Sequence, residues 1–348
     1  MGNVMSYSGI VTKVRSMQAK LLTEQDFETL AALGTVPQAI EYLKEQPAYA
    51  GYMNKLDVSL YHRGNVEKVL YQSLYDDWIK LYRFAGMEQK KFLKVYWKRY
   101  EIDLINYCLR IVFNHYDKPF DLDYKKEVFD RYSQISIEKL MTSGNVDELV
   151  ENLKGTEYYA PLCKIKETGE GRLFDYDLAL DLYYFTMLWK KQRRNLKKKE
   201  REIFTRDYGT KIDLLNIQWI YRAKKYYRLT PPDIYSLTIP IHYRLNVEDF
   251  KALVEAPSVE QFENRLQNSY YEKRYHFAGG KTIEQLYKDC LRQLYLTDRR
   301  REPYSIATIS TYLFLKEEEI YKLTTALECI RYGLTPRETL GYLGGVIQ

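Results

Sequence analysis

The sequence predicts an all-α protein, and three observations support this fold class. Apolar residues recur three and four positions apart in most segments, as on one face of a helix; Ile102, Ile105, Leu109 and Val112 form such a stripe. Convincing segments of alternating apolar and polar residues, the pattern of a half-buried strand, are absent. The helical pattern also repeats three times, at a period of about 110 residues, which predicts three similar helical domains.

Two markers define each repeat. The first occurs at residues 23–27, 246–250 and, more faintly, 133–137. Apolar residues follow it at matched distances, namely Leu30, Leu140 and Leu253, then Val36, Val146 and Val259, then Leu43, Leu153 and Leu266. The second marker occurs at residues 101–106, 211–216 and 319–324. Because no catalytic residue type repeats with these markers, they indicate a repeated scaffold.

Residues able to cap a helix mark the predicted helix starts. Thr23, Ser133 and Asn246 each stand four residues before an aligned apolar residue. The side-chain oxygen of each can accept a hydrogen bond from an amide in the first turn of a helix. Thr335 opens a Thr-Pro-Arg-Glu capping box, and Thr230 is its counterpart one repeat earlier.

We place the domain boundaries near residues 130 and 240, giving helical repeats over residues 1–130, 131–240 and 241–348. The second boundary lies beside Pro231, Pro232 and Pro240, which interrupt an otherwise helical pattern. Within the second repeat, residues 175 to about 205 are predicted to form one continuous helix. This helix is apolar at its start and strongly basic at its end.

Composition and charge exclude several classes of protein. A formal charge of +6 is too small by itself to indicate nucleic-acid binding. The four cysteines lie far apart without a CxxC pair, which is typical of buried thiols in a reducing compartment. The sequence contains no run of about 18–20 apolar residues that could cross a bilayer, and no secretory signal. We therefore expect a soluble, cytoplasmic protein.

No motif for catalysis, a metal or a cofactor is convincing. Residues 279–282 (Gly-Gly-Lys-Thr) resemble the end of a phosphate-binding loop, but Tyr275 stands where the first glycine is required. A loop before a helix that starts at Thr282 explains them better. The four histidines have no partner at metal-ligand spacing. The carboxylate runs at residues 76–77 and 317–319 are interpreted as solvated helix faces. We expect no active site, no cofactor and no metal.

The main candidate binding site is a basic cluster in the second repeat. Its members are Lys190, Lys191, Arg193, Arg194, Lys197, Lys198, Lys199 and Arg201. A smaller cluster, Arg299, Arg300 and Arg301, follows one repeat later. Three interpretations stay open: a solvated helix end that complements the carbonyl dipole, a surface for an acidic protein or anionic lipid headgroups, and a nucleic-acid surface. Aromatic residues precede the charges and do not alternate with them, which weakens the last interpretation.

Several segments together carry a resemblance to a known family. They are the opening residues 7–27, the markers at 101–106 and 211–216, which resemble that family's repeated helix starts, and residues 312–320, 331 and 333–336 near the end. In this order and spacing they resemble the C subunit of archaeal and bacterial V/A-type ATPases, whose eukaryotic counterpart is the d subunit. The resemblance extends from Tyr7 to about Leu343.

The resemblance implies a funnel of three similar domains around a pseudo-threefold axis, with no catalytic residue of its own. It implies a rotor adaptor, peripheral to the membrane on its cytoplasmic face. The adaptor would join the central-shaft subunits to the membrane ring that carries H⁺ or Na⁺, so that ATP hydrolysis or synthesis is linked to ion transport. Residues 190–201 would then face the polar loops of the ring or nearby headgroups. The alternatives are a freestanding scaffold that binds RNA or an acidic protein through residues 190–201, and an enzyme whose site forms across repeats.

Overall fold

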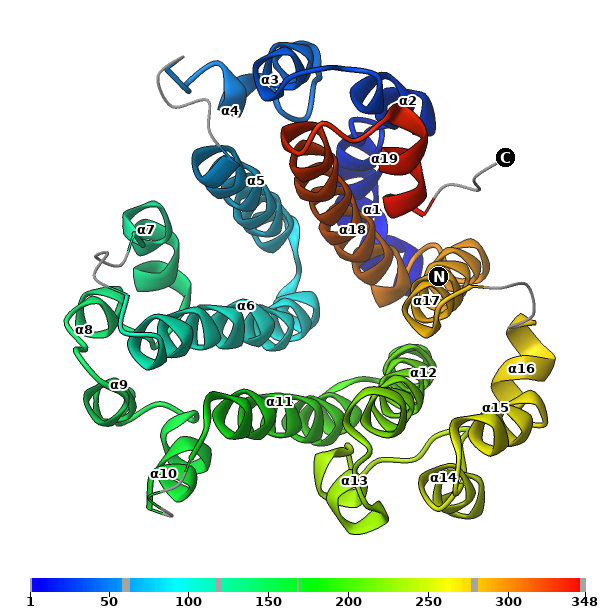
Figure 1. Ribbon diagram of the computed structural model, residues 1–348. Helices are drawn as coiled ribbons and strands as arrows, with labels where there is room; N and C mark the ends of the chain where they lie inside the picture. The colour runs from blue at the N-terminus through cyan, green and yellow to red at the C-terminus, as the bar shows by residue number, and fades with distance from the viewer. Residues whose placement is uncertain are drawn as a thin grey trace. The chain divides into compact units, whose positions relative to one another are not determined.

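Helices make up the regular secondary structure of the computed structural model (Figure 1), which describes residues 2–57, 63–116, 121–167, 169, 171–276 and 281–344. No strand occurs in these ranges, so the predicted all-α class is confirmed. Gly279 and Gly280, which belong to the motif resembling a phosphate-binding loop, lie outside the described residues. A helix does follow at the expected place, and Thr282 Oγ1 accepts a hydrogen bond from Gln285 N at 3.2 Å.

Contacts between helices divide the chain into two compact units. One unit combines the two chain ends, Met1–Lys90 and Tyr295–Gln348, and the other comprises Lys91–Leu294. The division falls inside α6 (Met87–Phe113) and α17 (Ile283–Arg301). Residue 130 lies within α7 (Asp123–Tyr132) and residue 240 lies in a connection. Domain boundaries at these two positions therefore stay a prediction.

The unit made from the chain ends is organised around α18 (Ile306–Arg331). Its other helices are α1 (Gly2–Gln18), α2 (Glu24–Ala31), α3 (Val36–Glu45), α4 (Ala50–Met53), α5 (Arg63–Phe84) and α19 (Pro336–Tyr342). The long helices α1, α5 and α18 pack against one another, and α2, α3 and α19 also contact α18 (Figure 1). Val14, Trp78 and Leu313 are fully buried in this core.

The second unit contains one order of helices twice, a long helix followed by four short helices and a second long helix. The first run is α6, α7, α8 (Ile137–Met141), α9 (Val146–Asn152), α10 (Tyr159–Glu167) and α11 (Leu173–Asn195). The second run is α12 (Lys198–Arg222), which continues into the π-helical turn η2 (Ala223–Tyr227), then α13 (Pro231–Leu237), α14 (Val247–Val254), α15 (Val259–Gln267), α16 (Tyr270–Tyr275) and α17. When the two chain ends are read as continuous and the intervening helix α1 is set aside, α18, α19, α2, α3, α4 and α5 follow the same order.

Capping residues begin two of the three first-marker helices where the sequence predicts. Thr23 and Asn246 accept hydrogen bonds from first-turn amides of α2 and α14. The prediction for Ser133 is wrong: this residue ends α7, and its hydroxyl accepts a hydrogen bond from the Ile135 amide at 3.0 Å. Ser136 caps α8 three residues later. The start is delayed because the chain first turns to bury Ile135.

The two proline-containing helix starts form as predicted. In α19 the capping box is complete, with Glu338 N donating to Thr335 Oγ1 at 3.3 Å and Thr335 N donating to Glu338 Oε2 at 2.8 Å. In α13 the amide of Thr230 donates to Asp233 Oδ2 at 3.3 Å. Proline in the first turn removes no helical hydrogen bond, because amides there have no partner within the helix.

The predicted apolar stripes face the core. Ile102, Ile105, Leu109 and Val112 are buried, and so are Ile320, Leu323, Leu327 and Ile330. The second markers, at residues 101–106, 211–216 and 319–324, lie in the interiors of α6, α12 and α18. The interpretation of the first two as helix starts is therefore wrong. The markers repeat because each includes the buried face of a long helix.

Residues 175–205 do not form the single helix that their pattern predicts. α11 ends at Asn195 and α12 begins at Lys198, with two extended residues between them. Leu196, with φ −87° and ψ 144°, is only 7 % exposed, so this turn places an apolar side chain in the core. Ile203 and Phe204 are buried on the far side of the turn, where α12 packs back against α11. Apolar burial on both sides outweighs the helix propensity of the intervening basic residues.

Candidate functional site

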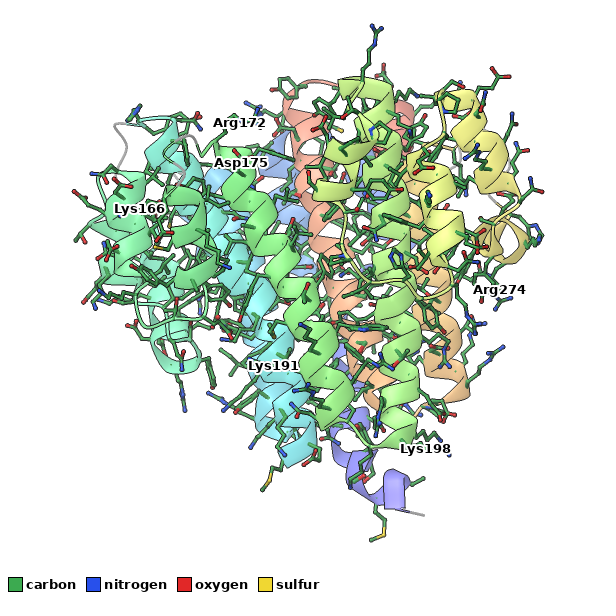
Figure 2. The ribbon with its side chains drawn as sticks, turned by 90° about the horizontal axis from the view of Figure 1, so that it is seen from below. Lys166, Arg172, Asp175, Lys191, Lys198 and Arg274 are labelled. Atoms are coloured by element: carbon green, nitrogen blue, oxygen red, sulfur yellow. The ribbon has the colours of Figure 1, made fainter. Side chains whose placement is uncertain are left out.

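The basic cluster lies at the turn between α11 and α12. Its members are Lys190, Lys191, Arg193 and Arg194 at the end of α11, Lys197 in the turn, and Lys198, Lys199 and Arg201 at the start of α12. All eight side chains are exposed. Figure 2 shows Lys191 and Lys198 at the same end of these two helices, opposite the end where Arg172 and Asp175 lie.

Only part of the cluster converges on a hollow of about 260 Å³. The lining residues are Trp189, Lys190, Arg193, Arg194 and Arg201. Arg193 Cζ lies 5.0 Å from the centroid of the Trp189 ring, a cation–π contact that orients the guanidinium. The Trp189 ring lies 6.3 Å from that of Phe204 in α12, so the hollow is supported by both helices. No acidic residue lines it.

The other lysines of the cluster lie outside this lining. Lys191 Nζ is 3.2 Å from Glu157 Oε2, and the second oxygen of Glu157 is 2.8 Å from Lys98 Nζ. Burial alone would raise the pKa of Glu157, but its hydrogen bond to Lys98 and the Lys98 charge hold that pKa below its usual value. Lys191 is therefore paired with an ionised carboxylate. The structure thus separates four converging cations from this paired lysine and from the lysines at residues 197–199.

The smaller arginine cluster forms the last turn of α17, in the unit made from the chain ends. Arg299 is half-buried and donates a hydrogen bond to Gln18 of α1. Burial lowers the pKa of Arg299, as do the charges of Arg300 and Arg15. Arg300 and Arg301 are exposed and complement the carbonyl dipole of the helix end. Arg299 therefore serves a contact within the fold.

Each of the three helical runs contains a buried carboxylate bonded to a buried tyrosine, an arrangement that local sequence patterns did not predict. The pairs are Glu101 with Tyr158 at 2.5 Å, Asp213 with Tyr271 at 2.6 Å, and Glu319 with Tyr49. In each pair the carboxylate belongs to the first long helix of the run. The tyrosine lies in the first turn of the last short helix or one residue before that helix begins. We call these pairs the tyrosine latches. The prediction that Glu319 lies on a solvated face is wrong, because its side chain is 5 % exposed.

In α12 the latch also fixes the connection between α13 and α14. Asp213 accepts hydrogen bonds from the backbone amides of residues 243, 244 and 245, at 3.1, 2.7 and 2.9 Å. Burial raises the pKa of Asp213, although these bonds and that of Tyr271 oppose the rise. The connection lies close to the helix: a Cβ on Gly209 would be 2.5 Å from Tyr243 Cγ. Glycine is therefore required at this point of α12.

In the unit of the chain ends, the latch is part of a buried charged network. Lys316 is 1 % exposed, and its Nζ donates to Tyr49 Oη at 2.8 Å and lies 3.5 Å from Glu319 Oε1. The second oxygen of Glu319 accepts a hydrogen bond from Leu22 N at 2.6 Å. Asp77 Oδ2 lies 4.0 Å from Lys316 Nζ. Burial lowers the pKa of Lys316 and raises that of Glu319, with the partner charge opposing each shift.

Within the described ranges, no three His, Cys, Asp or Glu side chains are placed to hold a metal ion. The cysteines are free thiols, and burial raises the pKa of Cys108 and of Cys290 to about 12. These two thiols therefore stay protonated and unreactive near neutral pH. What the arrangement can do is bind anions at the basic turn and hold long helices to short ones.

Comparison with known proteins identifies the family. Residues 10–342 match the model of the ATP synthase (C/AC39) subunit family. Several archaea have similar proteins, each named as the C subunit of an A-type ATP synthase. That of Methanosarcina mazei is 27 % identical over 270 residues, covering 76 % of this chain and 71 % of the relative. Those of Methanocaldococcus jannaschii and Thermococcus kodakarensis are each 25 % identical, covering 95 % and 98 % of this chain and 84 % and 91 % of the respective relative.

The match includes helices from all three runs, from α1 at residue 10 to the end of α19 at residue 342. It agrees with the resemblance drawn from the repeat markers and from both ends of the sequence. The chain belongs to the ATP synthase (C/AC39) subunit family.

Proposed function

We propose that this protein is the non-catalytic adaptor of the central rotor in a V/A-type ATPase. It couples the central shaft to the membrane ring, so that ATP hydrolysis or synthesis is linked to H⁺ or Na⁺ transport. The observation that carries this proposal is the family match over residues 10–342, since it covers all three helical runs. The relatives named as ATP synthase subunits support the same assembly.

The tyrosine latches support a mechanical role. A part that transmits torque must resist shear between its own helices. Each latch joins the middle of a long helix to the short helix that precedes the next long one, and each uses a carboxylate that is at most 5 % exposed. A hydrogen bond to a charged group contributes about 1.5–3 kcal/mol, and breaking it here would leave a buried charge. In every run, therefore, a buried hydrogen bond opposes the separation of the long helix from the short helix.

The proposed partners are the central-shaft subunits and the rotor ring of the same ATPase, with the protein peripheral to the membrane on its cytoplasmic face. None of the described helices has the length and apolar character needed to cross a bilayer. The basic cluster at residues 190–201 is assigned to the polar loops of the ring or to headgroups beside it. The names of the relatives do not support the RNA-binding alternative, and the hollow offers one aromatic ring, Trp189, where base stacking uses several.

The adaptor role is tested by gel filtration of the purified chain with the purified central-shaft subunits. We expect one stable complex. If the chain and the shaft subunits elute separately even at high protein concentration, a contact with the shaft is refuted. The role in coupling is tested in membrane vesicles depleted of this protein. These should hydrolyse ATP without ion uptake, and adding the chain back should restore uptake.

The placement of the basic cluster has its own test. Reversing Lys197, Lys198 and Lys199 to glutamate should weaken binding to the isolated membrane sector and reduce its dependence on salt. The same variant should still co-migrate with the shaft subunits, which controls for folding. Unchanged binding to the membrane sector would contradict this placement while leaving the adaptor role intact.

A further inference from the structure

We propose that the hollow at the α11–α12 turn binds the phosphate group of an anionic lipid headgroup. The inference rests on the proposed function, which brings the protein to a membrane. It adds the class of ligand and assigns two roles within the basic cluster. Four side chains contact the phosphate, and the outer lysines, Lys197 and Lys198, provide long-range attraction.

The side chains that line the hollow suit a phosphate group. Arg193, Arg194 and Arg201 present guanidinium groups, whose planar donors pair with two phosphate oxygens at once, and Lys190 adds a compact charge. The contact of Arg193 with the Trp189 ring, at 5.0 Å, restricts the guanidinium before any ligand arrives. Less side-chain entropy is therefore lost when the ligand binds.

Acidic side chains offset little of the charge around the hollow: the first turn of α12 contains one, Glu200, which is buried. Of the acids in the described ranges, none forms an ion pair with Lys190, Arg193, Arg194 or Arg201, whereas Glu157 pairs with the neighbouring Lys191. The residue before α12, Lys197, offers no side-chain acceptor to the first-turn amides of this 25-residue helix. Apart from the part that Glu200 offsets, the positive end of the helix dipole therefore adds to the four cations. An anion in the hollow would relieve this concentration of like charge.

Two features favour a lipid over a free anion. Trp189 forms one wall of the hollow, and indole rings are enriched where proteins meet the membrane–water interface. Lys197 and Lys198 are exposed beside the hollow and extend the positive surface beyond what one phosphate can contact. Such an extension strengthens attraction to a membrane that carries many anionic headgroups.

The experiment measures flotation of the full chain with vesicles of phosphatidylcholine alone and of equimolar phosphatidylcholine and phosphatidylglycerol. Two matched variants each remove two positive charges from the same turn. Arg193→Gln with Arg194→Gln alters the hollow, and Lys197→Gln with Lys198→Gln alters the outer lysines. If binding depends only on general attraction to a charged surface, both variants should lose the same affinity for the vesicles. Direct phosphate contact predicts that the arginine variant loses at least about tenfold more affinity than the lysine variant.

The outcomes separate the possible sources of the phosphate. Binding only to vesicles that contain phosphatidylglycerol, with the larger loss in the arginine variant, supports the proposal. Equal losses in the two variants, or equal binding to both kinds of vesicle, would overturn it. Titration with inorganic phosphate gives a further arm: tight binding of free phosphate without flotation would also overturn a lipid ligand.

Folding and the proposed function are checked separately. Both variants should keep the helical circular dichroism of the parent chain and its co-migration with the shaft subunits. A parent chain that joins the shaft subunits but does not float would contradict the lipid site alone. A parent chain that floats but never joins them would contradict the adaptor role.

Discussion

Replacing Lys316 by Met should destabilise the fold strongly, because it removes the cation of the buried network around α18. The lysine is 1 % exposed, and its Nζ lies 3.5 Å from Glu319 Oε1. At that separation and an effective dielectric constant of about 20, the gross attraction is about 5 kcal/mol. The variant also removes the desolvation penalty of the lysine itself. We expect a net loss of about 3–5 kcal/mol, the usual consequence of leaving a buried charge without its partner.

The assay is urea unfolding of the purified chain, followed by circular dichroism and by tryptophan fluorescence. Both probes are needed because the chain comprises two compact units and their transitions need not coincide. The double variant, Lys316→Met with Glu319→Gln, removes both charges and should be about 2 kcal/mol more stable than Lys316→Met alone. A loss of stability below about 1 kcal/mol for Lys316→Met would refute the reasoning. So would an effect of Glu319→Gln on stability that is the same in the parent chain and in the Lys316→Met variant.

The pH dependence tests the same network. Burial raises the pKa of Glu319 in the parent chain, and the Lys316 charge opposes that rise. Without the lysine the pKa of Glu319 rises further. Between the usual pKa of glutamate and this raised pKa, the folded state binds more protons than the unfolded state, so stability falls as pH rises. The deficit of the Lys316→Met variant should therefore be smaller near about pH 5 than near about pH 8. A deficit that is independent of pH would contradict an ionised Glu319.

Two further changes test the contact between α12 and the connection that joins α13 to α14. Gly209→Ala would place a Cβ 2.5 Å from Tyr243 Cγ, so we expect a loss of about 1–3 kcal/mol in thermal unfolding. Gly9→Ala is the matched control, because no atom lies within 4 Å of its added Cβ, and it should be neutral or stabilising by up to about 1 kcal/mol. Tyr271→Phe removes the hydroxyl that donates to Asp213 at 2.6 Å and should cost about 1–3 kcal/mol. An unchanged melting temperature would show that the backbone amides alone satisfy this carboxylate.

Local sequence patterns predicted the all-α class and several helix starts, and they failed where a contact between residues distant in the sequence determines the structure. Thr23 and Asn246 cap helices because the amides that they bind are three residues away. Leu196 looks like one more apolar residue at helical spacing. Its burial in the turn depends on α12 packing back against α11, which no local pattern specifies. The prediction for Ser133 is wrong because a serine can end a helix as well as begin one.

The candidate site was predictable in composition but not in geometry. The sequence indicated eight basic residues, yet it could not show which of them share a hollow, because the turn at Leu196 was not predicted. Trp189 and Arg193 stand four positions apart on one helix face, a spacing that does predict their contact. The latches were harder to find, since Tyr158 follows Glu101 by 57 positions. A nearly constant separation was the available signal: Tyr271 follows Asp213 by 58 positions.

The third latch differs from the other two in how far apart its residues lie along the chain. Tyr49 and Glu319 are separated by 270 positions, and the bond from Leu22 N to the same carboxylate spans 297. The run that contains α18 and α5 therefore cannot form until the last helices of the chain exist. Contacts of such high sequence separation slow folding, because loop closure must precede them. In return, one buried carboxylate in α18 binds Leu22 and Tyr49 from the segment that contains α2, α3 and α4. In this protein the ends form a helical run with each other, and under the proposed torque the bonds of Glu319 would be among those that keep that run intact.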